Sequence, residues 1–353
     1  MMVIDIQDYV KSQEKRLLID VRSPSEHAKG HIPGSINVPL LNDEERKEIG
    51  TIYKQESRKK AVRRGLDFFG PKMRDIVEKV DVITTSTDST ESYRQQVTLY
   101  CWRGGMRSNT MGWLLNTYGY DVTLIRGGYK SYRQWCQSQF EETTNIILLG
   151  GYTGTGKTHI LSLLKKNKLP VIDLENIAKH RGSAFGGIGM DSQPTQETFE
   201  NILALSVYVQ KKEHAYVIME DECQRIGTVS IPSVFWEQMK RSSLLFLKLG
   251  FRERIENILK EYGKLDRSLL AAAIIRLQKK LGGLETKECL GYLVNKDYYS
   301  SFTILLRYYD KLYQKSLEQK KTTLRSFYED EIVEMDQKAI VKIHDSIKKL
   351  SWK

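Results

Sequence analysis

The chain has 353 residues, which is enough for about two domains of ordinary size, each with a core of its own. Hydrophobic residues make up 40% of the sequence and charged residues 28%, a composition that excludes a disordered or fibrous protein. Lysine and arginine outnumber aspartate and glutamate by 55 to 44, and the resulting net charge of +11 favours a polyanionic partner such as nucleic acid.

The cysteines and the N-terminal segment indicate the compartment. The four cysteines include no CxxC pair, so neither a disulfide framework nor a structural zinc site is expected. Asp5 and Asp8 stand where a signal peptide would have a basic start and an apolar run. No wholly apolar run approaches the ~20 residues of a membrane helix. We therefore expect a cytoplasmic protein.

Residues 1–138 alternate short apolar strands with helical stretches, a pattern typical of an α/β domain with a parallel sheet. The polar run from Gln137 to Thr144 marks a domain boundary near residue 138. A second α/β pattern covers residues 139–250, and residues 251–353 carry helical periodicity alone. We predict two α/β domains and a helical C-terminal region packed on the second. The expected strands are RLLIDVR, VTLYCW and DVTLIRGG in the first domain, and NIILL, LPVIDLE, AYVIMED and SLLFLKL in the second.

A cysteine lies in a glycine and arginine loop, in the run TLYCWRGGMRS. Cys101 directly follows an expected strand, and a helix is expected from about Ser108. The helix N-terminus and the charges of Arg103 and Arg107 favour a thiolate, the form that accepts sulfur or selenium. We take Cys101, Arg103 and Arg107 as catalytic candidates. A buried structural cysteine is the alternative, since that is the commonest fate of this residue type.

The run GYTGTGKT at residues 151–158 fits the P-loop pattern GxxxxGK[ST], between an expected strand and an expected helix. Its backbone amides can converge on phosphate oxygens, Lys157 adds a charge, and Thr158 offers a hydroxyl to Mg²⁺. The motif predicts a P-loop NTPase-like second domain. It leaves open whether a kinase, an ATPase or an enzyme that releases diphosphate is present. The phosphate-binding candidates are Gly151, Thr153, Gly154, Thr155, Gly156, Lys157 and Thr158.

Two further segments are candidates for the same site. The strand AYVIMED ends in acids, where P-loop proteins often carry a metal ligand or a base, so Asp221 is expected to join Thr158 at Mg²⁺. A solvated turn is the alternative. The glycine-rich stretch from Asp173 to Gly187 is expected to be a long loop able to contact phosphate or nucleic acid, with a plain surface loop as the alternative. The candidates from the two segments are His180, Arg181, Ser183, Glu220 and Asp221.

Two basic clusters are candidates for RNA binding. The first holds Arg58, Lys59 and Lys60, followed by two more arginines, and it is equally consistent with a solvated helix face. The second interleaves basic residues with tyrosines near the cysteine loop, and such rings can stack on an exposed base. Its members are Arg126, Tyr129, Lys130 and Arg133, with Tyr132 between them.

The first domain resembles the rhodanese family. The resemblance rests on residues 17–40 (LLIDVRSPSEHAKGHIPGSINVPL), on the Cys101 loop and on residues 124–135 (LIRGGYKSYRQW). Members of that family carry sulfur or selenium on the loop cysteine. The resemblance implies that Asp20 and Arg22 support the site structurally, and we expect the two to pair near the end of their strand.

The whole chain resembles the tRNA 2-selenouridine synthase family, which joins a rhodanese domain to a P-loop domain. The resemblance rests on YCWRGGMRS, LENIAKHRGSAFG, EDECQRIG and LLRYYDKLY, which occur in this order. These motifs add Glu175 and Arg225 to the second-site candidates. One departure is Cys223, where a serine is expected, and it places a second thiol near the phosphate site.

That resemblance implies the replacement of sulfur by selenium at the wobble 2-thiouridine of tRNA, through an S-geranyl intermediate. Geranyl diphosphate and selenophosphate would be the substrates, and the anticodon stem-loop of tRNA would be the partner. The P-loop would hold the departing diphosphate, and Cys101 would act in the selenium stage. The alternatives are a rhodanese fused to an ATP-dependent kinase or ATPase, and a non-catalytic sulfur carrier or RNA-binding adaptor. A monomer is compatible with the sequence.

Overall fold

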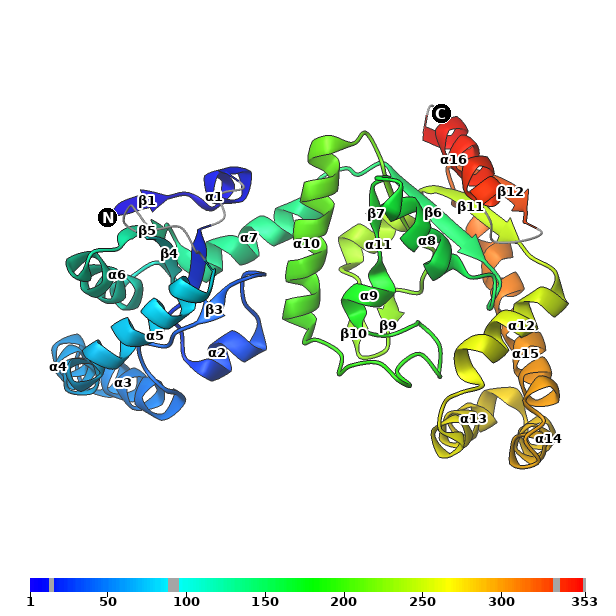
Figure 1. Cartoon of the computed structure of the whole chain (residues 1–353), viewed down its shortest axis with the longest axis horizontal. Helices are drawn as coiled ribbons and strands as arrows, with labels where there is room; N and C mark the ends of the chain where they lie inside the picture. Colours follow the sequence, from blue (N-terminus) through cyan, green and yellow to red (C-terminus); the bar gives the residue numbers. More distant parts are fainter. Residues whose placement is uncertain (13–15, 88–94, 333–336, 352–353) are drawn as a thin grey trace. The chain divides into compact units, whose positions relative to one another are not determined.

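In the computed structural model the chain folds into two units, Met1–Ser138 and Gln139–Lys353 (Figure 1). The structure describes every residue except 13–15, 88–94, 333–336 and 352–353. Both units are built on parallel sheets, so the predicted α/β class is confirmed. Within the described residues, no helix is both long enough and apolar enough to span a membrane.

Unit 1 is a five-stranded parallel sheet with helices packed against it. Its elements are β1 (Met2–Ile4), α1 (Ile6–Ser12), β2 (Leu17–Asp20), α2 (Pro24–Lys29), β3 (Ile36–Asn37), α3 (Asp43–Gln55), α4 (Arg58–Phe69), the 3₁₀ turn η1 (Gly70–Lys72), α5 (Met73–Thr87), β4 (Gln96–Tyr100), α6 (Met106–Tyr118), β5 (Asp121–Ile125) and α7 (Gly128–Glu141). The strand order is β1-β5-β4-β2-β3. The central strands are apolar because both faces of the sheet are covered. Because the strands are parallel, their carboxyl ends meet at one edge of the sheet, and the loop after β4 begins at that edge.

A buried ion pair organises that edge. Both carboxylate oxygens of Asp20 accept hydrogen bonds from Arg22, at 2.6 to 3.0 Å, and neither side chain is exposed. Arg22 also donates to the carbonyl of Gly30 at 2.7 Å, and its guanidinium lies 3.9 Å from the centre of the Tyr129 ring. The expected pairing of Asp20 with Arg22 is confirmed. It ties β2 to the loop after α2 and to α7.

Unit 2 has a second five-stranded parallel sheet. Its elements are β6 (Ile146–Gly151), α8 (Lys157–Lys166), β7 (Val171–Ile172), α9 (Leu174–Ala178), α10 (Gln196–Glu213), β8 (Val217–Glu220), β9 (Arg225–Ile226), β10 (Val229–Ser230), α11 (Ser233–Lys240), β11 (Ser243–Lys248), α12 (Phe251–Tyr262), α13 (Arg267–Leu281), α14 (Gly283–Val294), α15 (Tyr298–Lys321), β12 (Ser326–Glu331) and α16 (Gln337–Ser351). The strand order is β12-β11-β6-β8-β7, and β9 and β10 form a separate antiparallel hairpin.

The C-terminal region is helical, as expected, apart from one strand, β12, that the sequence did not indicate. Strand β12 pairs in parallel with β11 along its whole length, and α16 packs Ile343 and Ile347 into the sheet's core. The strand escapes sequence reasoning because its run, SFYEDE, contains three acids. An edge strand with one partner can be this polar, since part of its surface stays in water.

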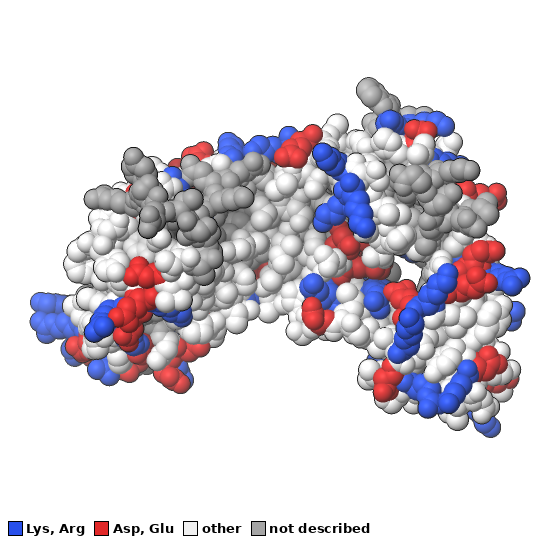
Figure 2. Space-filling model, in the orientation of Figure 1, with Lys and Arg blue, Asp and Glu red and all other residues white. Residues whose placement is uncertain are grey.

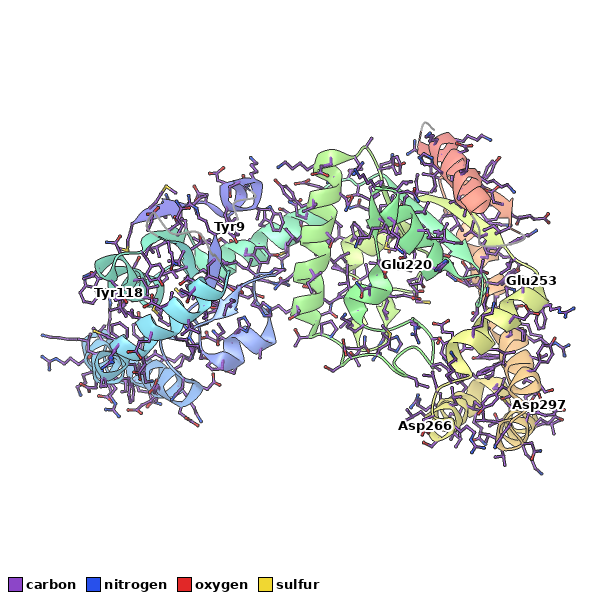
Figure 3. All side chains as sticks on the ribbon, viewed as in Figure 1. Tyr9, Tyr118, Glu220, Glu253, Asp266 and Asp297 are labelled. Carbon is purple, nitrogen blue, oxygen red and sulfur yellow. The ribbon has the colours of Figure 1, made fainter. Side chains whose placement is uncertain are left out.

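The remaining C-terminal helices, α12 to α15, form a second apolar cluster beside the sheet (Figure 1). Asp266 and Asp297, labelled in Figure 3, cap α13 and α15 by accepting hydrogen bonds from backbone amides of the first turn. The core of this cluster includes Ile258, Leu305 and Leu306. It therefore gives the P-loop domain a second hydrophobic body, joined to the sheet at the end of β11.

An arginine clamp joins that body to the P-loop. Arg254 of α12 is 4% exposed and makes two hydrogen bonds to Asp310 of α15, at 2.7 and 2.8 Å. The same guanidinium donates to the carbonyl of Thr153 at 3.1 Å, and Asn257 donates to the carbonyl of Gly154 at 3.0 Å. Gly154 has φ +81°, and a Cβ there would lie 2.6 Å from the carbonyl oxygen of Arg254. Helix α12 thus fixes the P-loop backbone at close range.

Replacing Asp310 by Ala should lower the free energy of unfolding of unit 2 by about 3 kcal/mol, because the Arg254 guanidinium would stay buried without an anion. Urea denaturation of the full chain measures this, with the transition of unit 2 assigned from hydrogen exchange of the β6 amides.

The matched control is Arg252→Gln on the same helix, which breaks an exposed pair with Glu256 and should cost less than about 1 kcal/mol. Equal losses in the two variants would show that the clamp does not stabilise unit 2.

Candidate functional site

Cys101 directly follows β4 and is 3% exposed. Its Sγ accepts a hydrogen bond from the amide of Gly105 at 3.3 Å and lies 3.3 Å from Oγ of Ser108. The loop is tight because Gly104 has φ +61° and a Cβ there would lie 2.8 Å from the carbonyl oxygen of Ile125. Helix α6 begins one residue after Gly105, so its N-terminus is adjacent to the sulfur. These donors can hold negative charge on a group bound at Cys101.

The two arginines of the loop have different environments. Arg107 forms an ion pair with Glu26 at 2.5 Å. Burial acts in the opposite sense, but Arg107 holds the pKa of Glu26 below its ordinary value. Arg103 is exposed and has no hydrogen bond or ion pair among the described residues. Of the two, Arg103 is therefore the cation available to a ligand at Cys101.

The tyrosines near this loop are buried, so the expectation that they stack on an exposed base is wrong. Tyr129 and Tyr132 have no exposed surface, and Arg22 covers the ring of Tyr129. Neither ring has a face open to a base. The accessible ring is Trp102, which is 36% exposed and packs against Tyr129 with centroids 5.7 Å apart. Sequence reasoning missed it, although an aromatic residue next to the loop cysteine was a usable signal.

The basic candidates of unit 1 differ in whether they are exposed and whether they already have an acidic partner. In the second cluster, Arg126 pairs with Asp5 at 2.9 Å, Lys130 is exposed and Arg133 is half-buried. In the first, Lys60 pairs with Glu56. Three exposed residues of α4 have side chains with no hydrogen bond or ion pair among the described residues: Arg58, Lys59 and Arg63. Charges of both signs cover the region of α3 and α4 in Figure 2.

The P-loop connects β6 to α8, as its motif predicts. Gly154 and Gly156 have φ +81° and +77°, a backbone conformation that glycine adopts without strain. Lys157 donates to the carbonyl of Gly151 at 2.8 Å, and Thr155 donates to the carbonyl of Tyr152 at 2.6 Å. The loop therefore curves back on itself, with the N-terminus of α8 at its end.

Two carboxyl groups lie next to Thr158. Its hydroxyl donates to Glu175 at 2.9 Å, and Glu175 shares a hydrogen bond with Glu222. Burial raises the pKa of Glu175, and burial together with the charge of Glu175 raises the pKa of Glu222 to about 8. The pair thus holds one proton between its two carboxyl groups near neutral pH. Sequence reasoning did not single out Glu222, whose importance depends on this contact.

The other acids of the strand end are engaged elsewhere. Glu220 is fully buried at the end of β8 (Figure 3), where it accepts a hydrogen bond from the amide of Leu174, and burial raises its pKa well above the ordinary value. Asp221 accepts hydrogen bonds from Tyr313 at 2.7 Å and Lys320 at 2.5 Å. The carboxylate that contacts Thr158 is therefore that of Glu175, not the expected Asp221. The described residues include no group of three or more His, Cys, Asp or Glu that could hold a metal ion.

The stretch from Asp173 to Gly187 begins with the short helix α9, which corrects that part of the expected loop, and it continues as a loop after α9. His180 accepts a hydrogen bond from the amide of Gly182 at 3.1 Å, and burial lowers its pKa. Arg181 pairs with Glu261 at 3.0 Å. Gly182 has φ +67°, and a Cβ there would lie 2.3 Å from the carboxylate of Glu222. The loop thus packs directly on the carboxyl pair.

The last two second-site candidates lie in different places. Ser183 continues the loop and accepts a hydrogen bond from the amide of Phe185 at 3.2 Å. Arg225 lies on the β9–β10 hairpin, is exposed and donates to the carbonyl of Gly227 at 3.0 Å.

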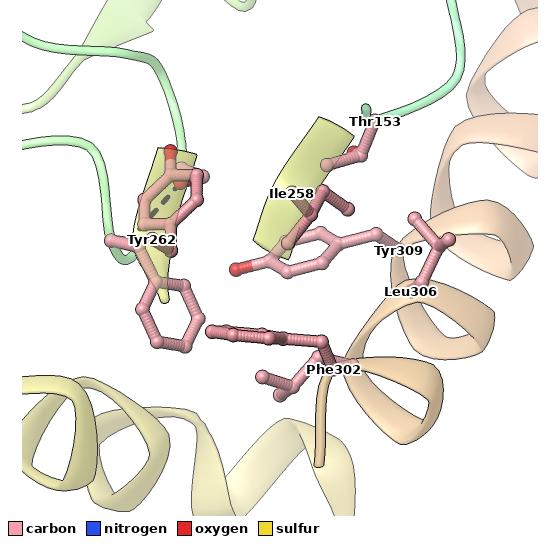
Figure 4. Close-up of a pocket in the computed structure, with 9 residues that line it drawn as sticks. Thr153, Ile258, Tyr262, Phe302, Leu306 and Tyr309 are labelled. Carbon is pink, nitrogen blue, oxygen red and sulfur yellow. Dashed lines mark hydrogen bonds between the residues drawn. The ribbon is translucent and has the colours of Figure 1, made fainter. Parts of the chain in front are cut away.

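A largely apolar pocket adjoins the P-loop (Figure 4). Its cavity volume is about 40 Å³, and it opens to solvent. Sequence reasoning did not find it, because aromatic residues at helical spacing are indistinguishable from core residues. The lining residues are Thr153, Ser183, Phe185, Ile258, Tyr262, Phe302, Leu305, Leu306 and Tyr309.

Comparison with known families assigns both units. The model described as tRNA 2-selenouridine synthase AAA domain matches residues 144–342, which is more than half of the chain. The model described as Rhodanese-like domain matches residues 5–134.

Several proteins named tRNA 2-selenouridine synthase are similar to this chain. The one from Shewanella denitrificans is 31% identical over 345 residues, which cover 87% of this chain and 90% of that protein. The one from Bdellovibrio bacteriovorus is 32% identical over 356 residues, covering 88% and 92%. The one from Nitrosomonas eutropha is 39% identical over 251 residues, covering 69% of this chain and only 62% of that protein. The chain belongs to the tRNA 2-selenouridine synthase family.

Proposed function

We propose that this protein is a tRNA 2-selenouridine synthase that replaces the sulfur of wobble 2-thiouridine by selenium through an S-geranyl intermediate. One combination supports the proposal most directly. A chain of this family contains both a loop cysteine, whose sulfur accepts a hydrogen bond from a backbone amide, and a phosphate-binding loop. The substrates are geranyl diphosphate, selenophosphate and the anticodon stem-loop of tRNA, which places the reaction in the cytoplasm.

In the first stage the thiocarbonyl sulfur attacks the allylic carbon of geranyl diphosphate. A carbon–sulfur bond forms, the carbon–oxygen bond breaks, and diphosphate leaves with the electron pair while the base loses its N3 proton. The negative charge that grows on the leaving group is neutralised by Lys157 and by the P-loop amides. No nucleotide is hydrolysed in this scheme.

In this proposal Mg²⁺ binds beside the P-loop through Thr158 and Glu175, rather than through Thr158 and the expected Asp221. Magnesium prefers oxygen ligands and often takes only one or two from protein, the rest coming from phosphate and water. Thr158 and Glu175 offer such oxygens side by side, whereas Asp221 is held by Lys320 and Tyr313. A bound ion would supply further charge for the departing diphosphate.

In the second stage selenium replaces the geranylated sulfur. The selenium of selenophosphate attacks C2 of the base, the carbon–sulfur bond to that carbon breaks, and the geranyl thiolate leaves and takes a proton from water. Water takes the phosphoryl group from selenium and releases phosphate. Arg103, which has no partner among the described residues, binds the phosphoryl oxygens, and the Cys101 loop holds the selenium. Trp102 offers its exposed ring to the base.

Replacing Cys101 by Ser should stop the reaction after its first stage, because the selenium site would lose its sulfur. Geranylated nucleoside should accumulate while formation of 2-selenouridine is lost. Mass spectrometry of tRNA nucleosides measures both, after incubation with 2-thiouridine tRNA, geranyl diphosphate and selenophosphate. The matched control is Cys223→Ser, which removes an exposed thiol and should leave both products unchanged. Normal selenouridine formation by Cys101→Ser would refute the assigned role.

Replacing Lys157 by Ala should slow geranylation by about 10²–10³-fold, because one preorganised donor to the developing charge is removed. The initial rate of geranylated nucleoside formation measures this. Lys165→Ala, which removes an exposed lysine of the same helix, should keep the normal rate. If Lys157→Ala instead abolishes ATP hydrolysis by the protein and leaves geranylation intact, the P-loop serves an ATPase and the proposal is wrong.

The double variant Lys59→Ala, Arg63→Ala should bind tRNA more weakly and with a shallower dependence on salt. Two lost phosphate contacts lower the slope of log K against log salt by about 2. Filter binding of tRNA from low to physiological salt measures the slope. Arg74→Ala, which removes an exposed arginine already paired with Glu78, is the control. An unchanged slope in the double variant would remove α4 from the RNA surface.

A further inference from the structure

The apolar pocket of unit 2 shares a residue with the P-loop. Thr153 lines the pocket, and its carbonyl accepts the hydrogen bond from the Arg254 clamp. The pocket therefore begins where the phosphate-binding backbone is held. A ligand with its charged end in the P-loop can place its other end in this pocket.

Helix α15 runs from the P-loop to the far end of the pocket. Tyr313 lies 3.4 Å from the amide of Gly151, and Asp310, one turn earlier, holds the Arg254 clamp. Phe302 is eight residues before Asp310, which is about 12 Å along a helix. In the view of Figure 4 the Tyr309 ring lies between Thr153 and Phe302. In Figure 4 Phe302 therefore lies on the side of Tyr309 away from Thr153, toward the end of the pocket remote from the P-loop.

The lining indicates the chemical class of the ligand. The residues of α12 and α15 that face the pocket are Ile258, Leu305, Leu306 and three aromatic rings. Four of the lining residues carry hydroxyls, but the surface of the pocket is almost wholly apolar, so a nucleobase would leave most of its ring donors and acceptors without partners, which is costly for buried polar groups. A hydrocarbon chain leaves none. A diphosphate joined to an isoprenoid chain therefore fits the P-loop and the pocket together better than a nucleotide does.

The aromatic rings have a second consequence. Tyr262 and Phe302 pack with ring centroids 6.3 Å apart, and Tyr309 lines the same pocket. Aromatic faces attract cations, and the effect is larger where water is excluded. A prenyl group gains positive character as its diphosphate departs. In the view of Figure 4, Tyr309 lies on the P-loop side of Phe302, so its ring is the one that can stabilise the transition state of prenyl transfer.

We propose that this pocket binds the isoprenoid chain of the prenyl donor, and that Phe302 limits the length of the chain that fits. The proposal rests on the proposed function for the identity of the reaction, and it adds the binding site of the chain and the residue that sets donor specificity. Phe302 touches the tail of the donor and not the reacting atoms, so its substitution changes donor choice rather than the chemical step.

Two variants of the full chain test this. Phe302→Leu lengthens the pocket, and the ratio of kcat/KM for farnesyl diphosphate to that for geranyl diphosphate should rise about tenfold or more, the range seen for small changes of fit in apolar pockets. Phe302→Trp fills the pocket, and it should weaken binding of geranyl diphosphate at least tenfold in calorimetry without tRNA while leaving binding of inorganic diphosphate unchanged.

The matched control is Tyr299→Leu, which changes an exposed aromatic residue on the same helix and should alter neither quantity. Circular dichroism verifies that each variant is folded. If Phe302→Trp does not fold, the donor ratio of Phe302→Leu alone tests the proposal. An unchanged donor ratio in folded Phe302→Leu would overturn the proposal. The proposal would also be overturned if the wild-type protein bound ATP more tightly than geranyl diphosphate and if Phe302→Trp lost that binding of ATP.

The outcomes separate this inference from the proposed function. If wild-type protein binds geranyl diphosphate more tightly than inorganic diphosphate, loses that preference in Phe302→Trp, and never geranylates tRNA, the pocket assignment stands and the proposed function fails. If tRNA is geranylated and the Phe302 variants keep the wild-type donor ratio, the pocket assignment fails and the proposed function stands.

Discussion

The buried guanidinium of Arg254 is the constraint on which the phosphate site depends. It is bound on one side by the carboxylate of Asp310 and on the other by the carbonyl of Thr153, so one charged group joins α12, α15 and the P-loop. A buried charge must keep its partners, because an unpaired guanidinium in the interior costs several kcal/mol. The P-loop backbone and the helices that form the pocket therefore cannot separate without breaking this arrangement.

The surroundings of the P-loop keep its negative charge low. Asp221 is neutralised by Lys320, Glu220 is buried with a pKa far above the ordinary value, and Glu175 and Glu222 share a proton. Four carboxyl groups near the P-loop would repel an anion if all were ionised. Their pairing and protonation lower the negative charge beside Lys157 and the backbone amides.

Local motifs made much of this molecule predictable. The P-loop and the Cys101 loop are recognisable because each packs its chemistry into a short run, with the strand before it and the helix after it showing their own periodicity. The Asp20–Arg22 pair was anticipated from the resemblance of the first domain to the rhodanese family. Strand β12 could not, because its partner β11 lies some 80 residues earlier and its sequence is too acidic to indicate a strand.

The two α/β domains, the cysteine loop, the P-loop and the family of the chain could all be predicted from the amino-acid sequence. The neighbours of each side chain could not. In the folded chain Arg107 pairs with Glu26 whereas Arg103 does not, Tyr129 is buried under Arg22, and Glu175 rather than Asp221 contacts Thr158. The physical reason is that a backbone cradle is specified by residues adjacent in sequence. Burial, charge pairing and a pocket wall are specified by residues that meet only after folding.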